Sequence, residues 1–486
     1  MTHLMISAAH KSSGKTTISM GLCAALNNQG LEVQAFKKGP DYIDPMWLSL
    51  ATGRDCHNLD FHSMAKDEIR GTFRQFAHQA DISLIEGNKG LFDGLDVEGR
   101  NSNAALARWL KAPVVLVIDA QGMTRGIAPL ILGYQAFDKR VNIAGVILNK
   151  LGGKRHEGKL RAVIEHYTDV PVIGAVHKHD DLLIKEQHLG LIPGQECKQT
   201  QERIQRIASL IADQVDLQAL QKIAGTAPEV KMGRYLKAVS HEPKTVRIGV
   251  ARDKAFGFYY PGDITALQAA GADIVNIDMI NDKTLPDVDG LFIGGGFPES
   301  YMSALSANVS MRTSIADAVE TGLPVYAECG GLMYLTRSIH WQGKTWPMVG
   351  ALPADAEMCQ RPQGRGYVRL QETDNFKWPS LKSECNKSTE PSKEFCAHEF
   401  HYSRLINLEK EQKFAYKVLR GTGITGKADG LLYKNVLASY AHLREVSHRR
   451  WASRFVLFIK QQKQGKISHY LSDNHRYNKP QSSVYP

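Results

Sequence analysis

Short apolar runs rich in β-branched residues alternate with helical patterns through the first half of the chain. The helical patterns are clearest at Lys15–Asn28 and Lys66–His78, and the apolar runs have the length of buried strands. Strands and helices that alternate in this way predict a parallel sheet covered on both faces, whose ligands bind at the carboxyl ends of the strands. The predicted strands are His3–Ala9, Glu32–Lys38, Asp81–Glu86, Pro113–Asp119, Ile143–Asn149 and Pro171–Val176.

A second unit of the same α/β class follows a stretch that interrupts the pattern. Residues Ala224–Lys244 lose their periodicity and gather breakers, which is typical of a linker. Further strands are predicted at Thr245–Ala251, Gly290–Ile293 and Pro324–Ala327. We therefore predict a first domain at 1–223, a linker at 224–244, a second domain at 245–460 and a basic, disordered tail at 461–486.

The second unit contains a strand, a tight turn and a helix with a cysteine at the turn, in the segment Leu323–Leu335. This order is typical of a nucleophile elbow, in which Cys329 would be the nucleophile. The glycines that follow, Gly330 and Gly331, permit unusual backbone angles and place N–H groups where an oxyanion would form. A buried cysteine that only packs at a strand end is the alternative interpretation.

A cysteine hydrolase also needs an imidazole to take the thiol proton and a second donor for the oxyanion. His442 follows an apolar, strand-like run and is expected at a strand end that faces a cleft. His398 and His401 are further candidates, and most of the 18 histidines must be incidental. Gly295 and Gly296 end the strand that precedes the elbow and are the candidate second donors.

The first strand–helix junction carries Gly14-Lys15-Thr16, which is typical of a phosphate-binding loop. Backbone N–H groups at a helix start cradle phosphates, Lys15 neutralises them, and the Thr16 hydroxyl can ligate Mg²⁺. The usual first glycine is missing, since Ala9 occupies its place, and a plain helix cap is the alternative. The position between a strand and a helix favours nucleotide binding.

Acidic residues follow two later strands, where a parallel sheet would gather them around the phosphates. Asp41 and Glu86 are the favoured Mg²⁺ ligands, whereas Asp44 and Asp93 are explained equally well as caps and turns. Lys37 is placed to hold a phosphate or a substrate carboxylate.

The composition is that of an ordinary soluble protein, with 43% of the 486 residues apolar and 23% charged. No stretch approaches the ~20 apolar residues that span a bilayer, and the first apolar run is too short for a secretory signal. The cysteines are scattered without metal-type pairing, which indicates a reducing, cytoplasmic location. They are Cys23, Cys56, Cys197, Cys329, Cys359, Cys385 and Cys396.

The net charge of +10 is concentrated at the C-terminus. Residues 447–486 hold eight Lys or Arg and one acid, so that the remaining chain carries only +3. A solvated tail explains this distribution better than a nucleic-acid-binding arm. We therefore expect neither a nucleic acid nor a membrane as a partner.

Motifs spread in order along nearly the whole chain carry a resemblance to a known family. The second unit resembles a class I glutamine amidotransferase domain, and the chain as a whole is similar to the cobyrinate a,c-diamide synthase family. The resemblance implies a dethiobiotin-synthetase-like P-loop domain that binds ATP and acts as an amidoligase, followed by the amidotransferase domain. The motifs are GKTT (Gly14–Thr17), FKKGPDYIDP (Phe36–Pro45), EGNKGLFDG (Glu86–Gly94), GGGFPE (Gly294–Glu299), AECGGLMYL (Ala327–Leu335), HEFHYS (His398–Ser403) and SYAHL (Ser439–Leu443).

The resemblance also implies a chemistry. ATP would phosphorylate peripheral acetate groups of a polycarboxylate tetrapyrrole, and ammonia released from L-glutamine at Cys329, with His442 as base, would give the amides. A homodimer is compatible with the sequence. The implied sites are Gly14, Lys15, Thr16, Thr17, Lys37 and Asn149 for ATP; Thr16, Asp41 and Glu86 for Mg²⁺; Asp44, Asp93 and Tyr42 for the substrate or intermediate; and Gly295, Gly296 and Gly330 for the oxyanion.

Several residues depart from the family pattern. Arg444 stands where a second histidine usually follows the base, and Asn88-Lys89 and His10-Lys11 are also atypical. These differences leave sirohaem and nickel-sirohydrochlorin open as substrates beside the cobyrinate of cobalamin biosynthesis. Two other classes stay as alternatives: a partitioning-type ATPase that binds DNA through the basic tail, and a tetrapyrrole carrier that uses ATP without amidation.

Overall fold

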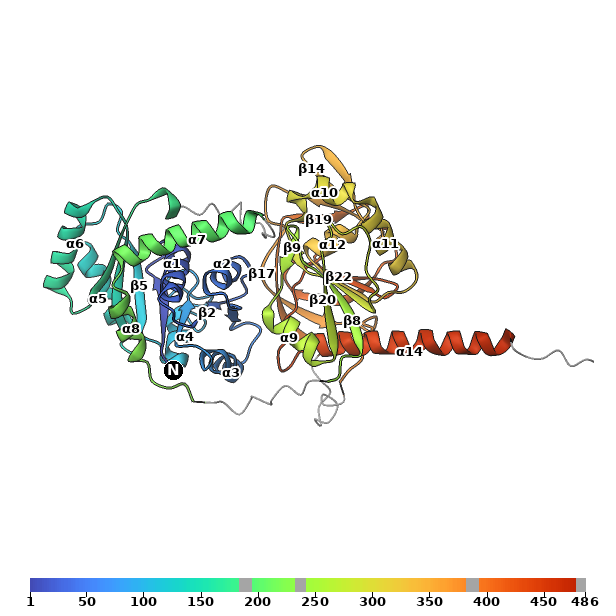
Figure 1. The fold of residues 1–486 in the computed structure, drawn as a ribbon, viewed down its shortest axis with the longest axis horizontal. Coiled ribbons are helices and arrows are strands. Elements are labelled where there is room, and N and C mark those ends of the chain that lie inside the picture. The colour runs from blue at the N-terminus through green and yellow to red at the C-terminus, as the bar shows by residue number, and fades with distance from the viewer. Residues whose placement is uncertain (183–194, 232–241, 382–392, 478–486) are drawn as a thin grey trace, which may run out of the picture. The chain divides into compact units, whose positions relative to one another are not determined.

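The computed structural model describes residues 1–182, 195–231, 242–381 and 393–477 (Figure 1). The chain divides into two compact units, Met1–Ala238 and Val239–Pro486, each with its own hydrophobic core. In the predicted linker, α8 (Leu217–Gly225) covers the first residues, and residues 232–241 lie outside the described part. None of the helices in the described ranges is long and apolar enough to cross a membrane.

Unit 1 is built on a seven-stranded sheet in which every neighbouring pair is parallel, in the order β3-β2-β4-β1-β5-β6-β7. Each strand predicted for this unit is present, with ends that differ by at most two residues, and the edge strand β3 was not predicted. The strands are β1 (His3–Ala8), β2 (Val33–Lys38), β3 (His57–Leu59), β4 (Ile82–Glu86), β5 (Val114–Asp119), β6 (Ile143–Leu151) and β7 (Val172–His177).

Helices cover this sheet, and two of them pack unusually closely. Gly21 of α1 faces α7, where a Cβ would come within 2.5 Å of Ile211 Cγ1, so only glycine allows this approach (Figure 1). The helices are α1 (Lys15–Asn28), α2 (Ile43–Thr52), α3 (Lys66–Ala77), α4 (Asn103–Leu110), α5 (Ile127–Phe137), α6 (Lys154–Tyr167), the short η1 (Asp180–Leu182), α7 (Gln195–Gln214) and α8.

Unit 2 is built on a nine-stranded mixed sheet in the order β10-β8-β11-β13-β22-β21-β20-β17-β18. The pairs from β10 to β22 are parallel and the pairs from β22 to β18 are antiparallel. The strands are β8 (Val246–Ala251), β10 (Ala272–Ile277), β11 (Gly290–Ile293), β13 (Val325–Glu328), β17 (Gly364–Glu372), β18 (Glu394–His401), β20 (Lys413–Arg420), β21 (Ala428–Tyr433) and β22 (Val436–Ser439).

Two smaller sheets and several helices complete unit 2. One small sheet has the order β15-β14-β16-β19, and the other pairs β12 with β9. These strands are β9 (Phe256–Phe258), β12 (Gly295–Gly296), β14 (Ser338–Trp341), β15 (Lys344–Pro347), β16 (Asp355–Met358) and β19 (Ser403–Ile406). The helices are α9 (Pro261–Ala269), η3 (Pro298–Ser300), α10 (Met302–Ala307), α11 (Val309–Glu320), α12 (Gly330–Leu335) and α14 (Trp451–Tyr477).

The C-terminal segment corrects one expectation. The predicted disordered tail began at residue 461, but α14 continues through residue 477, and only residues 478–486 lie outside the described part. The start of α14 is anchored in the core, where Trp451, Phe455 and Ile459 are buried. Trp451 packs edge-on against Phe292, with ring centroids 5.2 Å apart. A helix nucleated in the core can continue through residues of adequate helix propensity, which the charge count alone did not reveal.

Candidate functional site

The loop between β1 and α1 is held in place by the end of β6. Gly14 closes the loop with a φ of +87°, and a Cβ there would come within 2.3 Å of Asn149 Nδ2. The Asn149 amide donates to Ser13 O at 2.8 Å, and Lys150 Nζ donates to Ser12 O at 2.9 Å. The sequence-predicted residues Gly14 and Asn149 therefore lie together, with no room for a side chain between them.

Lys15 and Thr16 begin α1 directly after this loop. Lys15 is buried, and burial lowers the pKa of its ammonium group, an effect that Glu86 opposes. Thr16 Oγ1 lies 2.8 Å from Glu86 Oε1 and 3.2 Å from Asp44 Oδ2. Thr17 does not join this group, because its hydroxyl donates to the backbone oxygen of Leu182 at 3.3 Å.

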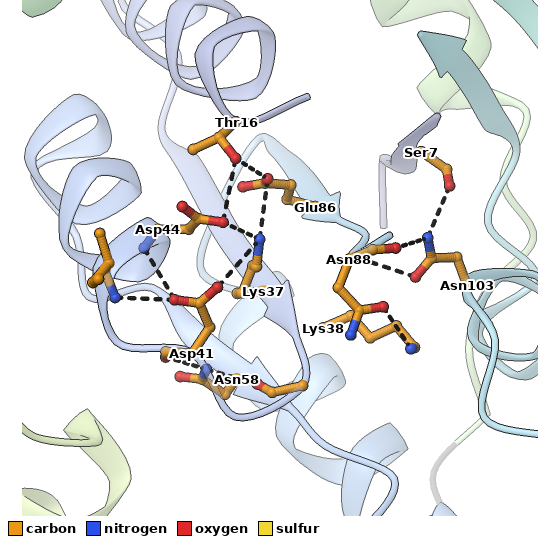
Figure 2. Close-up of polar contacts among 12 residues, drawn as sticks. Ser7, Thr16, Lys37, Lys38, Asp41, Asp44, Asn58, Glu86, Asn88 and Asn103 are labelled. Carbon is orange, nitrogen blue, oxygen red and sulfur yellow. Dashed lines mark hydrogen bonds and ion pairs between the residues drawn. The ribbon is translucent and has the colours of Figure 1, made fainter. Parts of the chain in front are cut away.

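Lys37, near the end of β2, joins the carboxylates that Thr16 contacts (Figure 2). Its ammonium group donates to Asp44 and lies 3.1 Å from Glu86 Oε1 and 3.6 Å from Asp41 Oδ2. Burial alone would lower the pKa of Lys37, but Asp44, Glu86 and Asp41 hold it well above its usual value. A charged lysine therefore balances the buried acids of this cluster.

Asp41 and Asp44 have different roles in the structure. Asp41 Oδ1 accepts hydrogen bonds from the backbone N–H groups of Ile43 at 3.0 Å and Asp44 at 3.2 Å, so it caps the start of α2 (Figure 2). Asp44 is the one whose carboxylate accepts a hydrogen bond from Thr16, and it also accepts one from Lys37. The sequence analysis favoured Asp41 over Asp44 as a Mg²⁺ ligand, whereas the hydrogen bond that Thr16 donates to Asp44 favours Asp44. Tyr42, between them, is buried at the N-cap of α2.

Glu86, the last residue of β4, has one buried oxygen without a partner. No described side chain or backbone group hydrogen-bonds to Oε2, and burial raises the pKa of this carboxyl to about 7. An unpaired buried carboxylate oxygen is costly, and a hydroxyl with two carboxylates is a donor set that Mg²⁺ prefers. Thr16, Asp44 and Glu86 therefore fit a magnesium ion.

This fit depends on ligands from outside the protein. Within the described ranges, no group of three or more His, Cys, Asp or Glu side chains is arranged to hold a metal ion by itself. Mg²⁺ in nucleotide sites takes one or two protein carboxylates and completes its shell with phosphate oxygens and water.

The loop after β4 is tied to the start of α4 by Asn103 (Figure 2). Its amide nitrogen lies 3.0 Å from Ser7 Oγ and 3.0 Å from Gly90 O, while its oxygen accepts from Asn88 N at 3.1 Å. Asp93, on the same loop, closes a turn by accepting from Gly90 N at 2.9 Å. The structure thus gives Asp93 a turn role, which was one of its two expected interpretations.

In unit 2, Cys329 stands between β13 and α12 in a strained conformation. Its φ is +48° and its ψ is −99°, a region that costs a non-glycine residue about 1–3 kcal/mol. The backbone is held there because Cys329 N donates to Ser439 O at 2.8 Å. A Cβ at Gly331 would come within 2.2 Å of Ile293 O, so the following helix packs directly onto β11. A strained residue between a strand and a helix has the geometry of a nucleophile elbow.

The surroundings of the thiol keep it protonated in the absence of a base. Cys329 is 7% exposed, and its Sγ lies 3.8 Å from the backbone oxygen of Phe400. Burial raises the pKa of the Cys329 thiol, and the carboxylate of Glu299 raises it further. A nucleophilic role for this sulfur therefore requires a group that removes its proton.

His442 lies just beyond the end of β22 and is fixed on more than one side. Its Nδ1 lies 3.2 Å from Glu328 Oε2, and its backbone N–H donates to His398 O at 2.8 Å. The two imidazole rings stack with centroids 4.8 Å apart and planes inclined by 14°. A Cβ at Gly295 would come within 2.6 Å of His442 Cε1, so this ring lies against the glycine turn.

The predicted oxyanion glycines lie together beside the elbow. A Cβ at Gly330 would come within 3.1 Å of Gly296 N and 2.9 Å of Pro298 Cδ. A Cβ at Gly296 would come within 1.9 Å of Ala255 O, which leaves no space for a side chain. The turn that contains Gly295 and Gly296 therefore packs on the first residue of α12, next to Cys329.

Sequence reasoning missed one residue of this site, Glu328, which was quoted only as part of a motif. His398 was a candidate base, and the structure places its ring against that of His442. The signal for Glu328 was present, because an acid that ends an apolar, buried strand needs a partner. His401, the other candidate, stacks on Tyr440 with ring centroids 3.8 Å apart and bonds to Ser403 O.

Comparisons with known proteins agree with the division of the chain into two units. Residues 4–191 match the family described as the CobQ/CobB/MinD/ParA nucleotide binding domain. Residues 247–449 match the CobB/CobQ-like glutamine amidotransferase domain. The chain is therefore a nucleotide-binding protein that carries a glutamine amidotransferase domain.

Relatives match both parts together. A cobyrinate a,c-diamide synthase of Magnetococcus marinus is 42% identical over 92% of this chain and 95% of the relative. Proteins of the same name from Methanosarcina acetivorans and Archaeoglobus fulgidus are 43% and 40% identical, each over 93% of this chain and over 94% and 96% of the respective relative. The chain belongs to the cobyrinate a,c-diamide synthase family.

Proposed function

We propose that this protein is a carbon–nitrogen ligase that amidates the a- and c-acetate carboxylates of a tetrapyrrole, with ATP and L-glutamine as co-substrates. The observation that supports this most strongly is the presence in one chain of two features: a strained cysteine elbow whose preceding glutamate contacts an imidazole, and a glycine-closed loop with a lysine–carboxylate cluster. Relatives named for this reaction match the chain over more than nine-tenths of its length.

Unit 1 would activate the carboxylate. A carboxylate is a poor acyl donor, and transfer of the γ-phosphoryl group of ATP converts it to an acyl phosphate. The N–H groups at the start of α1 and the ammonium of Lys15 would bind the phosphates. Thr16, Asp44 and Glu86 would hold Mg²⁺, which supplies positive charge to the transferred phosphoryl group when bound.

Lys37 has a supporting role in this proposal. Its ammonium group is committed to Asp44 and Glu86, so we infer that it positions these carboxylates and limits their repulsion. Asn149 and Gly14 shape the loop, and Asp41 fixes the start of the helix that carries Asp44. Tyr42 stays a candidate substrate contact.

Unit 2 would release ammonia. His442 takes the proton from Cys329, and the sulfur attacks the side-chain amide of glutamine. The C–S bond forms, the N–H groups of Gly330 and the Gly295-Gly296 turn stabilise the oxyanion, and the C–N bond breaks as His442 returns the proton to the leaving nitrogen. Water then hydrolyses the thioester to glutamate. The ammonia displaces phosphate from the acyl phosphate in unit 1, and two such cycles give the a,c-diamide.

Replacement of the nucleophile tests this division of labour. Cys329→Ser should abolish glutamine-dependent amidation and retain activity with added ammonium salt, because only the nitrogen source is lost. Cys359→Ser, a half-buried cysteine after β16, is the matched control and should keep both activities. Loss of ammonium-dependent activity in a folded C329S protein would contradict the proposal.

The macrocycle is identified by mass spectrometry. Cobyrinate, sirohaem and nickel-sirohydrochlorin are incubated in parallel with the protein, ATP, Mg²⁺ and glutamine. We expect two carboxyl-to-amide conversions on cobyrinate. If only sirohaem or nickel-sirohydrochlorin is converted, the amidoligase chemistry stands and the proposed substrate is replaced. If none of the three macrocycles is converted, both the chemistry and the substrate are contradicted.

A further inference from the structure

One buried carboxylate beside the nucleophile has no part in the proposed function. Glu328 is the last residue of β13 and directly precedes Cys329, and only 2% of its surface is exposed. A carboxylate in so buried a place destabilises the fold unless it is paired and hydrogen-bonded. Its partners therefore indicate what it does.

Both oxygens of Glu328 are engaged, and each partner is buried. Oε2 lies 3.2 Å from His442 Nδ1, and Oε1 accepts from the backbone N–H of Leu443 at 2.8 Å. The phenol of Tyr326, two residues earlier on β13, donates to Oε1 as well. Glu328 thus binds both the side chain of His442 and the peptide that follows it.

The strand pairing explains how Glu328 reaches this position. β13 and β22 are parallel neighbours, with Glu328 opposite Ser439 in the register. The chain leaves β22 three residues before His442, and the backbone of His442 pairs with His398. Glu328, at the end of β13, and His442, just beyond the end of the neighbouring strand β22, are therefore brought together at the carboxyl ends of two central strands of the sheet.

We propose that Glu328 is the positioning residue of the glutaminase centre and that it holds His442 with the proton on Nδ1. An ionised carboxylate only accepts hydrogen bonds, so the nitrogen that faces it must carry the proton. The lone pair is then on Nε2, so Nε2 is the nitrogen that would take the proton of Cys329 in the proposed glutamine hydrolysis. When Nε2 accepts that proton, the imidazolium forms next to a fixed negative charge. The inference rests on the proposed glutamine hydrolysis and adds the residue that orients its base.

Glu328→Gln tests the proposal at constant shape. The amide oxygen can still accept from Leu443 N and Tyr326, but its NH₂ group then faces His442 Nδ1 and favours the proton on Nε2. We expect kcat for glutamine hydrolysis to fall about 10²–10⁴-fold, as when the carboxylate behind a catalytic histidine is replaced by an amide. The KM for glutamine should change little, and the ammonium-dependent activity should be retained.

Two comparisons separate positioning from a structural role. Tyr326→Phe removes another buried hydrogen bond to Glu328 and leaves the contact with His442, so it should lower stability but keep most of kcat. Glu328→Asp keeps a carboxylate with a shorter reach and should recover part of the activity that E328Q loses. A kcat in E328Q within about threefold of the parent, or equal losses in E328Q and Y326F, would overturn the proposal.

A double-variant cycle shows whether Glu328 acts through His442. His442→Asn should abolish most of the glutaminase activity, and addition of E328Q to this variant should cost nothing further, since residues that act as a unit are not additive. A further loss in the double variant would overturn the proposal. If E328Q does not fold, the same cycle is run with E328D. Absence of glutaminase activity in the parent protein would instead refute the proposed function.

Discussion

At the scale of single residues, the two candidate sites treat buried charge in opposite ways. In unit 1, the ammonium group of Lys37 pairs with the acids around it. These ion pairs offset the cost of burying the charges. In unit 2, Glu299 raises the pKa of the Cys329 thiol, and its own carboxyl has a pKa raised to about 7 by burial. The first arrangement stabilises a charged cluster, whereas the second makes the thiolate harder to form. Under the proposed function, the thiol therefore depends on His442 to remove its proton.

The effect of Glu299 on the thiol is testable by alkylation. At pH 8, above the pKa of about 7 for Glu299, the carboxylate is ionised and keeps the thiol pKa high. Glu299→Gln removes this charge, lowers the thiol pKa and should speed the reaction of Cys329 with iodoacetamide, by about threefold for each unit of pKa, because the larger thiolate fraction is partly offset by weaker nucleophilicity. Near pH 6 the parent carboxyl is mostly protonated, so parent and variant should react at similar rates.

Peptide-resolved mass spectrometry measures this rate for Cys329 separately from the other cysteines, and C329S provides the blank. A rate ratio that is the same at both pH values would contradict an electrostatic effect of Glu299.

The need for glycine at the phosphate loop is testable with a matched pair. Gly14→Ala places a Cβ 2.3 Å from Asn149 Nδ2, so the loop or the amide must move. We expect the affinity for ATP to fall at least tenfold, about 1.4 kcal/mol, in a titration with a fluorescent ATP analogue. Gly30→Ala is the control, because it has a similar φ of +85° but nothing within 4 Å of the added Cβ.

The control should lose only the ~1–2 kcal/mol of stability that a left-handed backbone costs, with unchanged affinity for the nucleotide. Equal ATP affinities of the two variants would show that the contact with Asn149 is not needed.

The sequence predicted where the candidate residues lie along the strands better than it predicted their contacts. The order of motifs placed Thr16, Glu86, Cys329 and His442 near strand ends, because the carboxyl ends of parallel strands share an edge. The sequence favoured Asp41 over Asp44 as the Mg²⁺ ligand, whereas Thr16 bonds to Asp44; both acids lie at the start of the same helix, and only side-chain direction separates them. Glu328 was missed because its partner is distant in sequence and is supplied by the pairing of β13 with β22.

At the scale of elements, most of the parallel strands could be predicted, except the edge strands β3 and β10, whereas most of the antiparallel strands could not. A strand buried on both faces is a continuous apolar run, and β1, β5 and β13 are of this kind. β17 mixes buried with exposed positions and includes charged residues, which gives no continuous apolar run. β18 is similar, with an exposed acid at its start. The four-stranded sheet of unit 2 was missed for the same reason.

The anchoring of α14 leads to a prediction about stability. Phe455 is fully buried against Trp378, with ring centroids 5.0 Å apart, so Phe455→Ala should destabilise unit 2 by about 3–5 kcal/mol. Truncation after Gly465 should leave the unfolding midpoint unchanged, because residues 463–465 are already exposed. Denaturant unfolding followed by tryptophan fluorescence measures both.

A matched control is Gln464→Ala, which lies on the exposed part of the same helix. A large loss of stability in the truncated protein would mean that the end of α14 contributes to the core, contrary to this interpretation.

At the scale of the whole molecule, the two chemistries must be coupled, because each alone is unproductive. Unit 1 without ammonia would make an acyl phosphate that water destroys, and unit 2 without an acceptor would waste glutamine. Near neutral pH most ammonia is protonated and is not a nucleophile, so release into bulk solvent would be inefficient. Under the proposed function we therefore expect nitrogen to pass from Cys329 to the acyl phosphate without equilibrating with the solvent.

An ammonia scavenger tests this coupling. Glutamate dehydrogenase with 2-oxoglutarate and NADH removes free ammonium from the assay. We expect the glutamine-dependent amidation of the parent to resist the scavenger, whereas the ammonium-dependent amidation of C329S is abolished by it. Thr16→Val, which removes a hydroxyl bonded to Glu86 at nearly constant shape, should keep glutamine hydrolysis and lose amidation from either nitrogen source. A mixture of T16V and C329S, supplied with glutamine, would then make amide only from ammonia that has escaped to the solvent, and the scavenger should stop it. Equal sensitivity of the parent and of this mixture would mean that the nitrogen travels through bulk water.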